Sequence, residues 1–157
     1  MILKHTDLPV LRKRYHNKKI VVGSGVFDLL HVGHVVYLQS LKNYGDIVVV
    51  IVKPDARVKE YKHKSRPIVP EQDRARMVDS IKGVDYVIIG SNNLSEEAAD
   101  TYKKVFELLK PDAYVTTNEV WGKLQEITDA KVYVLPREQV GYFESTTALV
   151  EHIQKID

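Results

Sequence analysis

Residues 20–34 read IVVGSGVFDLLHVGH, and the fold can be worked out from this stretch. Its first part, Ile20–Ser24, is a short β-branched run with a glycine near its end, which predicts a buried strand. From about Val32 to Tyr44 apolar residues recur near helical spacing, and Gly45 follows, which predicts a helix. The stretch therefore predicts a strand, a polar loop and a helix in direct succession.

Strands and helices alternate along the rest of the chain in the same way. Further strands are predicted at 46–53, 85–90, 113–117 and 131–135, and helices at 71–83, 96–109 and 146–156, with a polar, basic loop over 54–70. This alternation favours one parallel sheet with helices on both faces. We expect an α/β fold, a Rossmann-like, doubly wound sheet of five parallel strands, with ligands beyond the carboxyl ends of the strands. Residues 1–17 are expected to lie outside the core, as an N-terminal helix or arm.

The composition narrows the class of protein. With 157 residues, 44% of them apolar and 28% charged, the chain is expected to be a single soluble domain, residues 1–157. The net charge of +2 implies no broad nucleic-acid surface. The chain has no cysteine, which excludes disulfides and iron–sulfur clusters. No run resembles a signal peptide or a membrane span, so we expect a cytoplasmic protein with no membrane partner.

Two nucleotide motifs fail when they are tested on the loop after the first strand. Gly23 and Gly25 supply the first half of G-x-G-x-x-G, but Asp28 stands where the third glycine belongs. The second predicted strand ends at Lys53, without the acidic residue that a dinucleotide site needs. A P-loop is excluded because no G-K-[ST] follows.

A metal site and a phosphate site both stay open for the same loop. His31 and His34 share a helix face, and with Asp28 as a third ligand they would suit zinc. Alternatively, the helix start offers free N–H groups to an anion, and Gly25 lets the backbone come close to it. The histidines would then donate hydrogen bonds to phosphate oxygens, across a face that Gly33 keeps open. Asp28 could hold Mg²⁺, orient a hydroxyl or stabilise the turn.

The string GVFDLLHVGH, residues 25–34, resembles the signature of the H-x-G-H nucleotidyltransferases, which include cytidylyltransferases and adenylyltransferases. The resemblance implies that His31 and His34 stabilise the α-phosphate under attack, and that Val26 and Phe27 also lie at the nucleotide. It implies no covalent intermediate. A substrate phosphate attacks the nucleoside triphosphate, which carries Mg²⁺, and pyrophosphate leaves.

The segment PDARVKEYKHKSRPIVPEQDRARMVDSIKGVDYVI, residues 54–88, is similar to bacterial heptose-1-phosphate adenylyltransferases. The resemblance places Lys59 on the triphosphate and assigns Arg66 and Arg74 to the substrate site. Lys62 and Lys64 are interpreted as solvated charges of a basic loop.

The carboxyl-terminal part carries both a match and two departures. ESTTALVEHIQKI, residues 144–156, is similar to the family's closing motif, and it implies that Ser145, Thr146 and Thr147 bind nucleotide phosphates. The family's Lys-Gly-Gly-Asp stretch is replaced here by TTNEVW, in which Thr116 and Glu119 are assigned to the nucleotide. An Arg-Thr-x-Gly-Ile pattern typical of cytidylyltransferases is absent, which argues against CTP.

The sequence therefore predicts a nucleotidyltransferase that moves AMP from ATP to a sugar phosphate of the heptose-1-phosphate type. Three alternatives stay open. They are a cytidylyltransferase that uses CTP and glycerol-3-phosphate or a related polyol or aminoalcohol phosphate, an adenylyltransferase of the FAD synthetase type, and a nucleotide-binding module without catalysis. A homodimer is expected from the resemblance alone.

Overall fold

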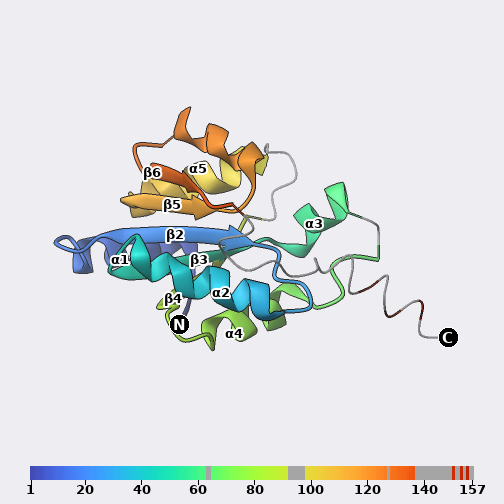
Figure 1. Cartoon of the computed structure of the whole chain (residues 1–157). Coiled ribbons are helices and arrows are strands. Elements are labelled where there is room, and N and C mark those ends of the chain that lie inside the picture. The colour runs from blue at the N-terminus through green and yellow to red at the C-terminus, as the bar shows by residue number, and fades with distance from the viewer. Residues whose placement is uncertain are drawn as a thin grey trace.

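The computed structural model describes residues 1–62, 65–91, 98–126 and 128–136, together with 150, 153 and 155. Its centre is a sheet of six parallel strands in the order β1-β4-β3-β2-β5-β6 (Figure 1). The strands are β1 (Ile2–Leu3), β2 (Ile20–Gly25), β3 (Ile47–Val52), β4 (Tyr86–Ile89), β5 (Ala113–Thr116) and β6 (Lys131–Val134). The predicted doubly wound parallel sheet is confirmed, with one strand more than the five expected.

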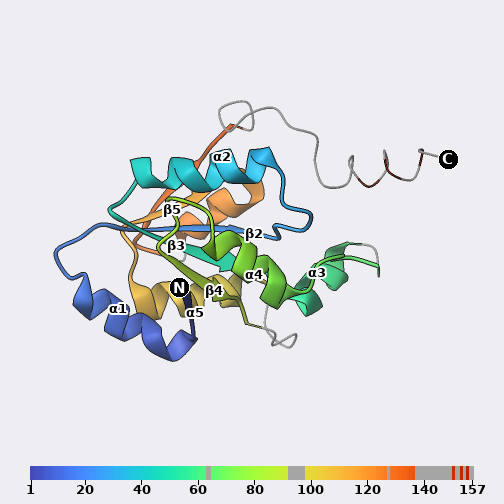
Figure 2. The ribbon, with the colours of Figure 1, turned by 90° about the horizontal axis from the view of Figure 1, so that it is seen from below.

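Helices cover both faces of the sheet, as Figure 2 shows. On one face α2 (Val32–Ser40) and α4 (Glu71–Asp79) bury Leu38 and Val78 against β2 and β3. On the other face α1 (Leu8–Arg14) and α5 (Ala98–Leu109) bury Leu8 and Phe106. Because β2 and β3 are covered on both sides, they are apolar almost throughout, which is why both strands could be predicted from the sequence.

Two sequence-based expectations need correction. Residues 1–17 do not lie outside the core, because β1 pairs with β4, and Leu8 and Leu11 are 0% and 5% exposed. A strand of two residues and a helix of seven are too short to show a clear period. The loop predicted over 54–70 contains α3 (Asp55–Tyr61), a helix rich in charged residues in which Val58 is fully buried.

The remaining elements follow the sequence with shifted ends. The helix predicted from Val32 ends at Ser40 and continues as the 3₁₀ turn Leu41–Asn43, and further 3₁₀ segments cover His5–Asp7 and Glu119–Glu126. The helix predicted over 146–156 lies outside the described residues, apart from 150, 153 and 155. In the part of the chain that is described, no helix has the length and apolar character that crossing a membrane requires.

The strand order reverses at one point of the sheet. From β2 the chain moves outward through β3 to β4, and it then returns to add β5 on the opposite side of β2. Ligands of such sheets bind beyond the carboxyl ends of the strands where this reversal occurs. The loop that carries His31 leaves β2 at that point.

The buried position of Leu8 can be tested by truncation. Leu8→Ala should lower the free energy of unfolding by about 2–5 kcal/mol, because it leaves a cavity in the core between the sheet and helices α1 and α5. Val10→Ala is the matched control, since Val10 is 69% exposed on the same helix and its loss should cost less than about 0.5 kcal/mol. Equal midpoints in urea unfolding for the two variants would contradict the packing described here.

Candidate active site

Two imidazole rings lie side by side where β2 passes into α2. His31 is the residue before the helix, with extended backbone angles, and His34 lies in the first turn. Their ring centroids are 3.8 Å apart, and the His31 N–H donates to Nδ1 of His34 over 3.4 Å. Nδ1 of His31 is buried and has no hydrogen-bond partner among the described residues. The pair therefore presents a ring nitrogen without a described partner, Nδ1 of His31, at a helix N-terminus, where an anion is favoured.

The surroundings of both histidines favour the neutral imidazole. Burial, then the nearby charges of His31 and Lys62, lower the pKa of His34 to about 4, although Asp28 acts in the opposite direction. Burial also lowers the pKa of His31. Since the two rings oppose each other's protonation, a negatively charged ligand is what would favour the charged form.

The loop between β2 and the histidines has a fixed, unusual backbone. Phe27 and Leu29 have φ angles of 56° and 51°, in the left-handed region that side chains rarely adopt. Phe27 is 1% exposed, and its ring meets the His34 ring edge-on at 5.4 Å. A Cβ at Gly25 would lie 2.7 Å from the Phe27 ring, so this packing requires glycine there. Phe27 therefore supports His34 from inside the protein.

Asp28 ties the histidine loop to the basic loop that precedes α4. Its Oδ1 accepts the N–H groups of Ile68 and Val69, each at 3.0 Å, and its Oδ2 lies 2.9 Å from Nε of Arg66. These contacts join two loops about forty residues apart, a role that the sequence did not predict for Asp28. No group of three His, Cys, Asp or Glu side chains that could hold a metal ion occurs among the residues described.

Arg74 supports the site without facing it. Its side chain is fully buried: Nε donates to the carbonyl of Val69 at 2.8 Å, Nη2 to Oδ1 of Asp55 at 2.6 Å, and Nη1 to the carbonyl of Val26. The guanidinium thus joins the loops that follow β2 and β3 to the start of α4. The assignment of Arg74 to direct substrate binding is corrected accordingly, because a group enclosed in this way positions other residues.

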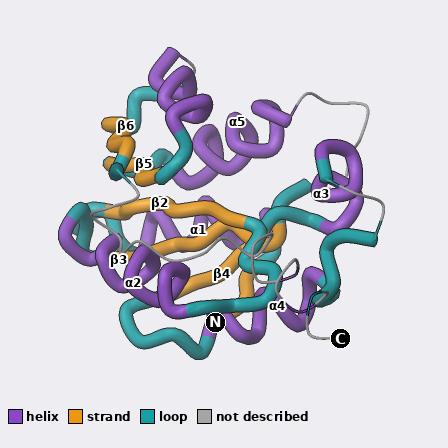
Figure 3. The backbone as a smooth tube through the Cα atoms, turned by 45° about the vertical axis from the view of Figure 1, so that its right-hand side comes forward, coloured by secondary structure: helices purple, strands orange, loops and turns teal. Residues whose placement is uncertain are grey.

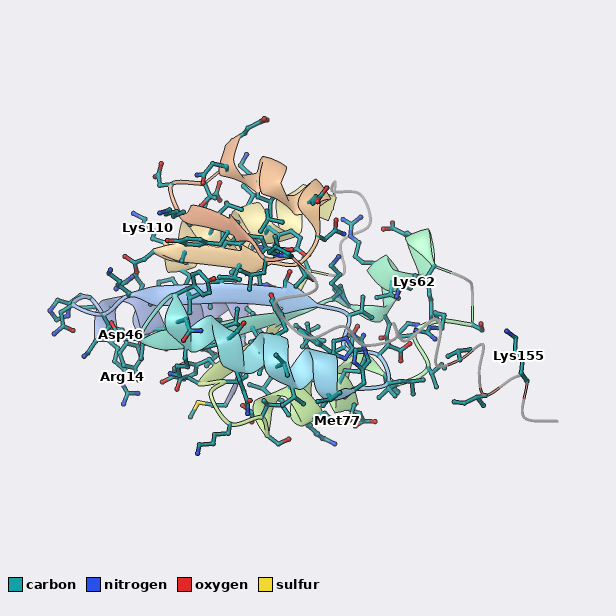
Figure 4. The ribbon with its side chains drawn as sticks, viewed as in Figure 1. Arg14, Asp46, Lys62, Met77, Lys110 and Lys155 are labelled. Carbon is teal, nitrogen blue, oxygen red and sulfur yellow. The ribbon has the colours of Figure 1, made fainter. Side chains whose placement is uncertain are left out.

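The lysine whose charge acts on His34 is Lys62, not the Lys59 that the sequence favoured. Lys59 is exposed on α3, whereas the charge of Lys62 lowers the pKa of His34 and of Lys53. Figure 4 shows Lys62 at the end of α3, on the side of the molecule toward which β2 runs. Burial and the charge of Lys62 lower the pKa of Lys53 to about 8.

Lys53 was not singled out from the sequence, and Lys62 was interpreted as a solvated charge. The signal for Lys53 was its position at the end of the second predicted strand, since the carboxyl ends of neighbouring parallel strands meet at one edge. Lys62 gave no comparable signal, because its place depends on the unexpected helix α3.

Arg66 is the predicted substrate residue that forms an ion pair with Asp28 in the histidines' loop. Its side chain is 9% exposed and is held through Nε by Asp28. Nη2 is buried, and no described group accepts a hydrogen bond from it. This edge of the guanidinium is suited to an anionic ligand, because a buried donor without an acceptor costs free energy.

The remaining predicted nucleotide contacts are placed only in part. Val26 and Gly33 belong to the loop and to the first turn of α2. Thr116 ends β5, is 4% exposed, and accepts the Asn118 N–H at 3.1 Å, while Glu119 is exposed in the segment that follows. The predicted phosphate-binding residues Ser145, Thr146 and Thr147 lie outside the described residues.

The geometry at this edge is that of an anion site, and comparison with known proteins identifies its class. A family model described as cytidylyltransferase-like matches residues 22–152. The chain therefore belongs to the cytidylyltransferase-like family.

Among individual proteins, the chain is 38% identical over 152 residues to the bifunctional protein HldE of a Nitratiruptor species. It is 42% identical over 144 residues to that of Helicobacter pylori (strain Shi470). These alignments cover 94% and 90% of this chain but only 31% and 29% of the relatives, so the chain spans about a third of their length.

Solved structures agree with the fold. The lipopolysaccharide core biosynthesis protein from Thermoplasma volcanium GSS1 aligns with a TM-score of 0.61 at 27% identity, over 76% of this chain and 97% of that one. The pantoate-beta-alanine ligase of Francisella tularensis aligns with a TM-score of 0.63 at 14% identity, over 99% and 78% of the two chains, and this likeness concerns the fold alone.

Lys59, within α3, and Lys62, at its carboxyl end, allow a matched test of which lysine acts on the bound nucleotide. Lys62→Met should lower kcat/KM for nucleotidyl transfer at least tenfold, because it removes a charge beside His34. Lys59→Met should change it less than threefold, because Lys59 is exposed. The reverse order of effects in steady-state assays would restore the assignment made from the sequence.

The lowered pKa of His34 also predicts proton uptake on binding of a polyphosphate. In the protein without ligand, the pKa of His34 is about 4. A polyanion bound beside the ring would raise this pKa, so the complex would bind more protons than the free protein. Affinity for tripolyphosphate should therefore rise as the pH falls from 8 to 6, by at most about tenfold per unit for one proton. Calorimetry in buffers of different ionisation enthalpy measures the uptake, which should diminish in His34→Asn. Proton release would contradict the proposed contact.

Proposed function

We propose that this chain transfers AMP from ATP, carried as its Mg²⁺ complex, to the phosphate of a small sugar phosphate, with release of pyrophosphate. The observation that carries the proposal is the pair of closely spaced imidazoles at the start of α2, in a protein of the cytidylyltransferase-like family. Paired donors at a helix N-terminus suit a phosphate on which negative charge grows during the reaction.

The arrangement supports an in-line reaction without a covalent enzyme intermediate. An oxygen of the acceptor phosphate attacks the α-phosphorus of ATP, the bond to the bridging oxygen breaks, and pyrophosphate leaves with the electron pair. His31 and His34 donate hydrogen bonds to the α-phosphate, and Lys62 and Lys53 offset charge on the leaving group. Positioning and electrostatics account for the catalysis, so no general base is needed.

The acceptor is assigned to the side of Arg66. The guanidinium presents a buried Nη2 and is fixed by Asp28, which makes it a rigid partner for a phosphate oxygen. A sugar phosphate is favoured because the bifunctional protein HldE and a lipopolysaccharide core biosynthesis protein are among the similar proteins. A homodimer in the cytoplasm completes the proposal on grounds of family resemblance.

Pyrophosphate release tests the proposed reaction. The protein is incubated with each of ATP, CTP, GTP and UTP and with heptose-1-phosphate, glycerol-3-phosphate or FMN. Turnover with ATP and the heptose phosphate is expected. Preference for CTP with glycerol-3-phosphate, or for ATP with FMN, would select one of the alternative enzymes. Tight nucleotide binding without turnover on any acceptor would identify a binding module.

Removal of one imidazole should stop the reaction without unfolding the protein. His34→Ala is expected to lower kcat about 10²–10³-fold, in the range seen when one transition-state donor is lost. His16→Ala is the control, because His16 is exposed and makes a single contact, 3.3 Å long, with the Lys13 carbonyl. Circular dichroism confirms the fold of each variant. Normal turnover by a folded His34→Ala protein would remove the proposed role.

A further inference from the structure

A tyrosine hydroxyl lies between the two strands that flank the reversal of strand order. Direct pairing of β2 with β5 extends from Val21 to Gly23 on β2, whereas pairing of β2 with β3 continues to Gly25. Beyond Gly23, the hydroxyl of Tyr37 accepts the Ser24 N–H at 3.1 Å and donates to the Val115 carbonyl at 2.7 Å. One side chain from α2 thus connects the backbones of two strands where they part. Figure 3 shows α2 and these strands.

The surrounding residues hold the hydroxyl at this point. Gly23 makes room for it, because a Cβ there would lie 2.9 Å from the Tyr37 oxygen and 2.6 Å from Cδ1 of Leu41. Burial raises the pKa of Tyr37 well above its usual range, so the hydroxyl keeps the proton that it donates. On the opposite face of β2, Oγ of Ser24 meets the hydroxyls of Tyr114 and Tyr102 at 2.8 and 3.2 Å. The end of β2 is therefore fixed from both faces.

A continuous row of rings leads from this hydroxyl to the histidines. The ring of Tyr37 stacks against Phe27 at 6.5 Å, with 23° between the ring planes, and Phe27 meets His34 edge-on. These ring contacts connect Tyr37 with the loop that leaves β2. Arg66 belongs to the basic loop, and its partner Asp28 is pinned to that loop by the N–H groups of Ile68 and Val69, so the position of Arg66 depends less on the spacing of β2 and β5.

We propose that Tyr37 is a positioning residue whose hydroxyl sets the spacing between the ends of β2 and β5 and so controls the affinity for the nucleotide rather than for the acceptor. The nucleotide part of this inference rests on the proposed function, while the structural part does not. Removing the hydroxyl leaves the ring in place, so Tyr37→Phe separates its bridging role from its packing role. The backbone groups of Ser24 and Val115 then lose a shared partner.

Tyr15→Phe is the matched control, because Tyr15 also shares a hydroxyl hydrogen bond, 2.9 Å long, with Tyr86 at the start of β4. Tyr37→Phe should raise KM for ATP at least tenfold and leave KM for the acceptor within threefold of its normal value. Tyr15→Phe should change neither. Amide hydrogen exchange of residues 24–30 should quicken in Tyr37→Phe, while exchange over β4 stays as in the unaltered protein.

Three outcomes would overturn the inference. Unchanged KM for ATP removes the control of nucleotide affinity, even if exchange quickens. A parallel rise of both KM values together with faster exchange over β4 shows general loosening instead of a local spacing effect. In the unaltered protein, NMR should detect a slowly exchanging Tyr37 hydroxyl proton near the Ser24 amide, and its absence would refute the bridge without any variant. If the unaltered protein turns over no substrate, the proposed function fails, and exchange and NMR still decide the bridge.

Discussion

The contact between the Asp28 carboxylate and the loop before α4 is the constraint on which the active site depends. One buried side chain receives two backbone N–H groups and a guanidinium from a segment about forty residues further along the chain. Charge-assisted hydrogen bonds of this kind are stronger than neutral ones, and their loss would leave a buried charge without compensation. The histidine loop and the basic loop therefore fix each other's position. The buried side chain of Arg74 adds a second connection, because it donates to the carbonyls of Val26 and Val69.

This arrangement explains why the site gathers positive charge from segments that are distant in sequence. Lys53 follows β3, Lys62 follows α3 and Arg66 precedes α4, yet the charge of Lys62 acts on His34 and Lys53, and the charges of Arg66 and Asp28 act on Lys62. Burial, and then the charge of Lys62, lower the pKa of Lys53, so the protonated form of this side chain is disfavoured in the folded chain. A polyanionic ligand of the kind proposed would favour that protonated form, and part of its binding free energy would come from interactions that the folded chain leaves unfavourable.

The sequence predicted the sheet and the histidine pair because their signals are local. Ile20–Ser24 is an unbroken buried run, and the string from Gly25 to His34 combines strand, loop and helix within one short segment. Features that depend on contacts between distant parts of the chain could not be predicted from such local signals. Nothing near Asp28 indicates that it binds Ile68 and Val69, nor does the sequence around Lys62 show that α3 brings it toward His34. Likewise, Leu8 belongs to the core only because α1 packs beside α5.

The positive φ angles of Phe27 and Leu29 have a consequence for the thermodynamics of substrate capture. Left-handed backbone at non-glycine residues is unfavourable and is kept only where the surroundings enforce it. That cost is met once, when the polypeptide folds, and not each time a substrate arrives. Binding then requires little reordering of this segment, so its entropy penalty is small, as expected for a preorganised site.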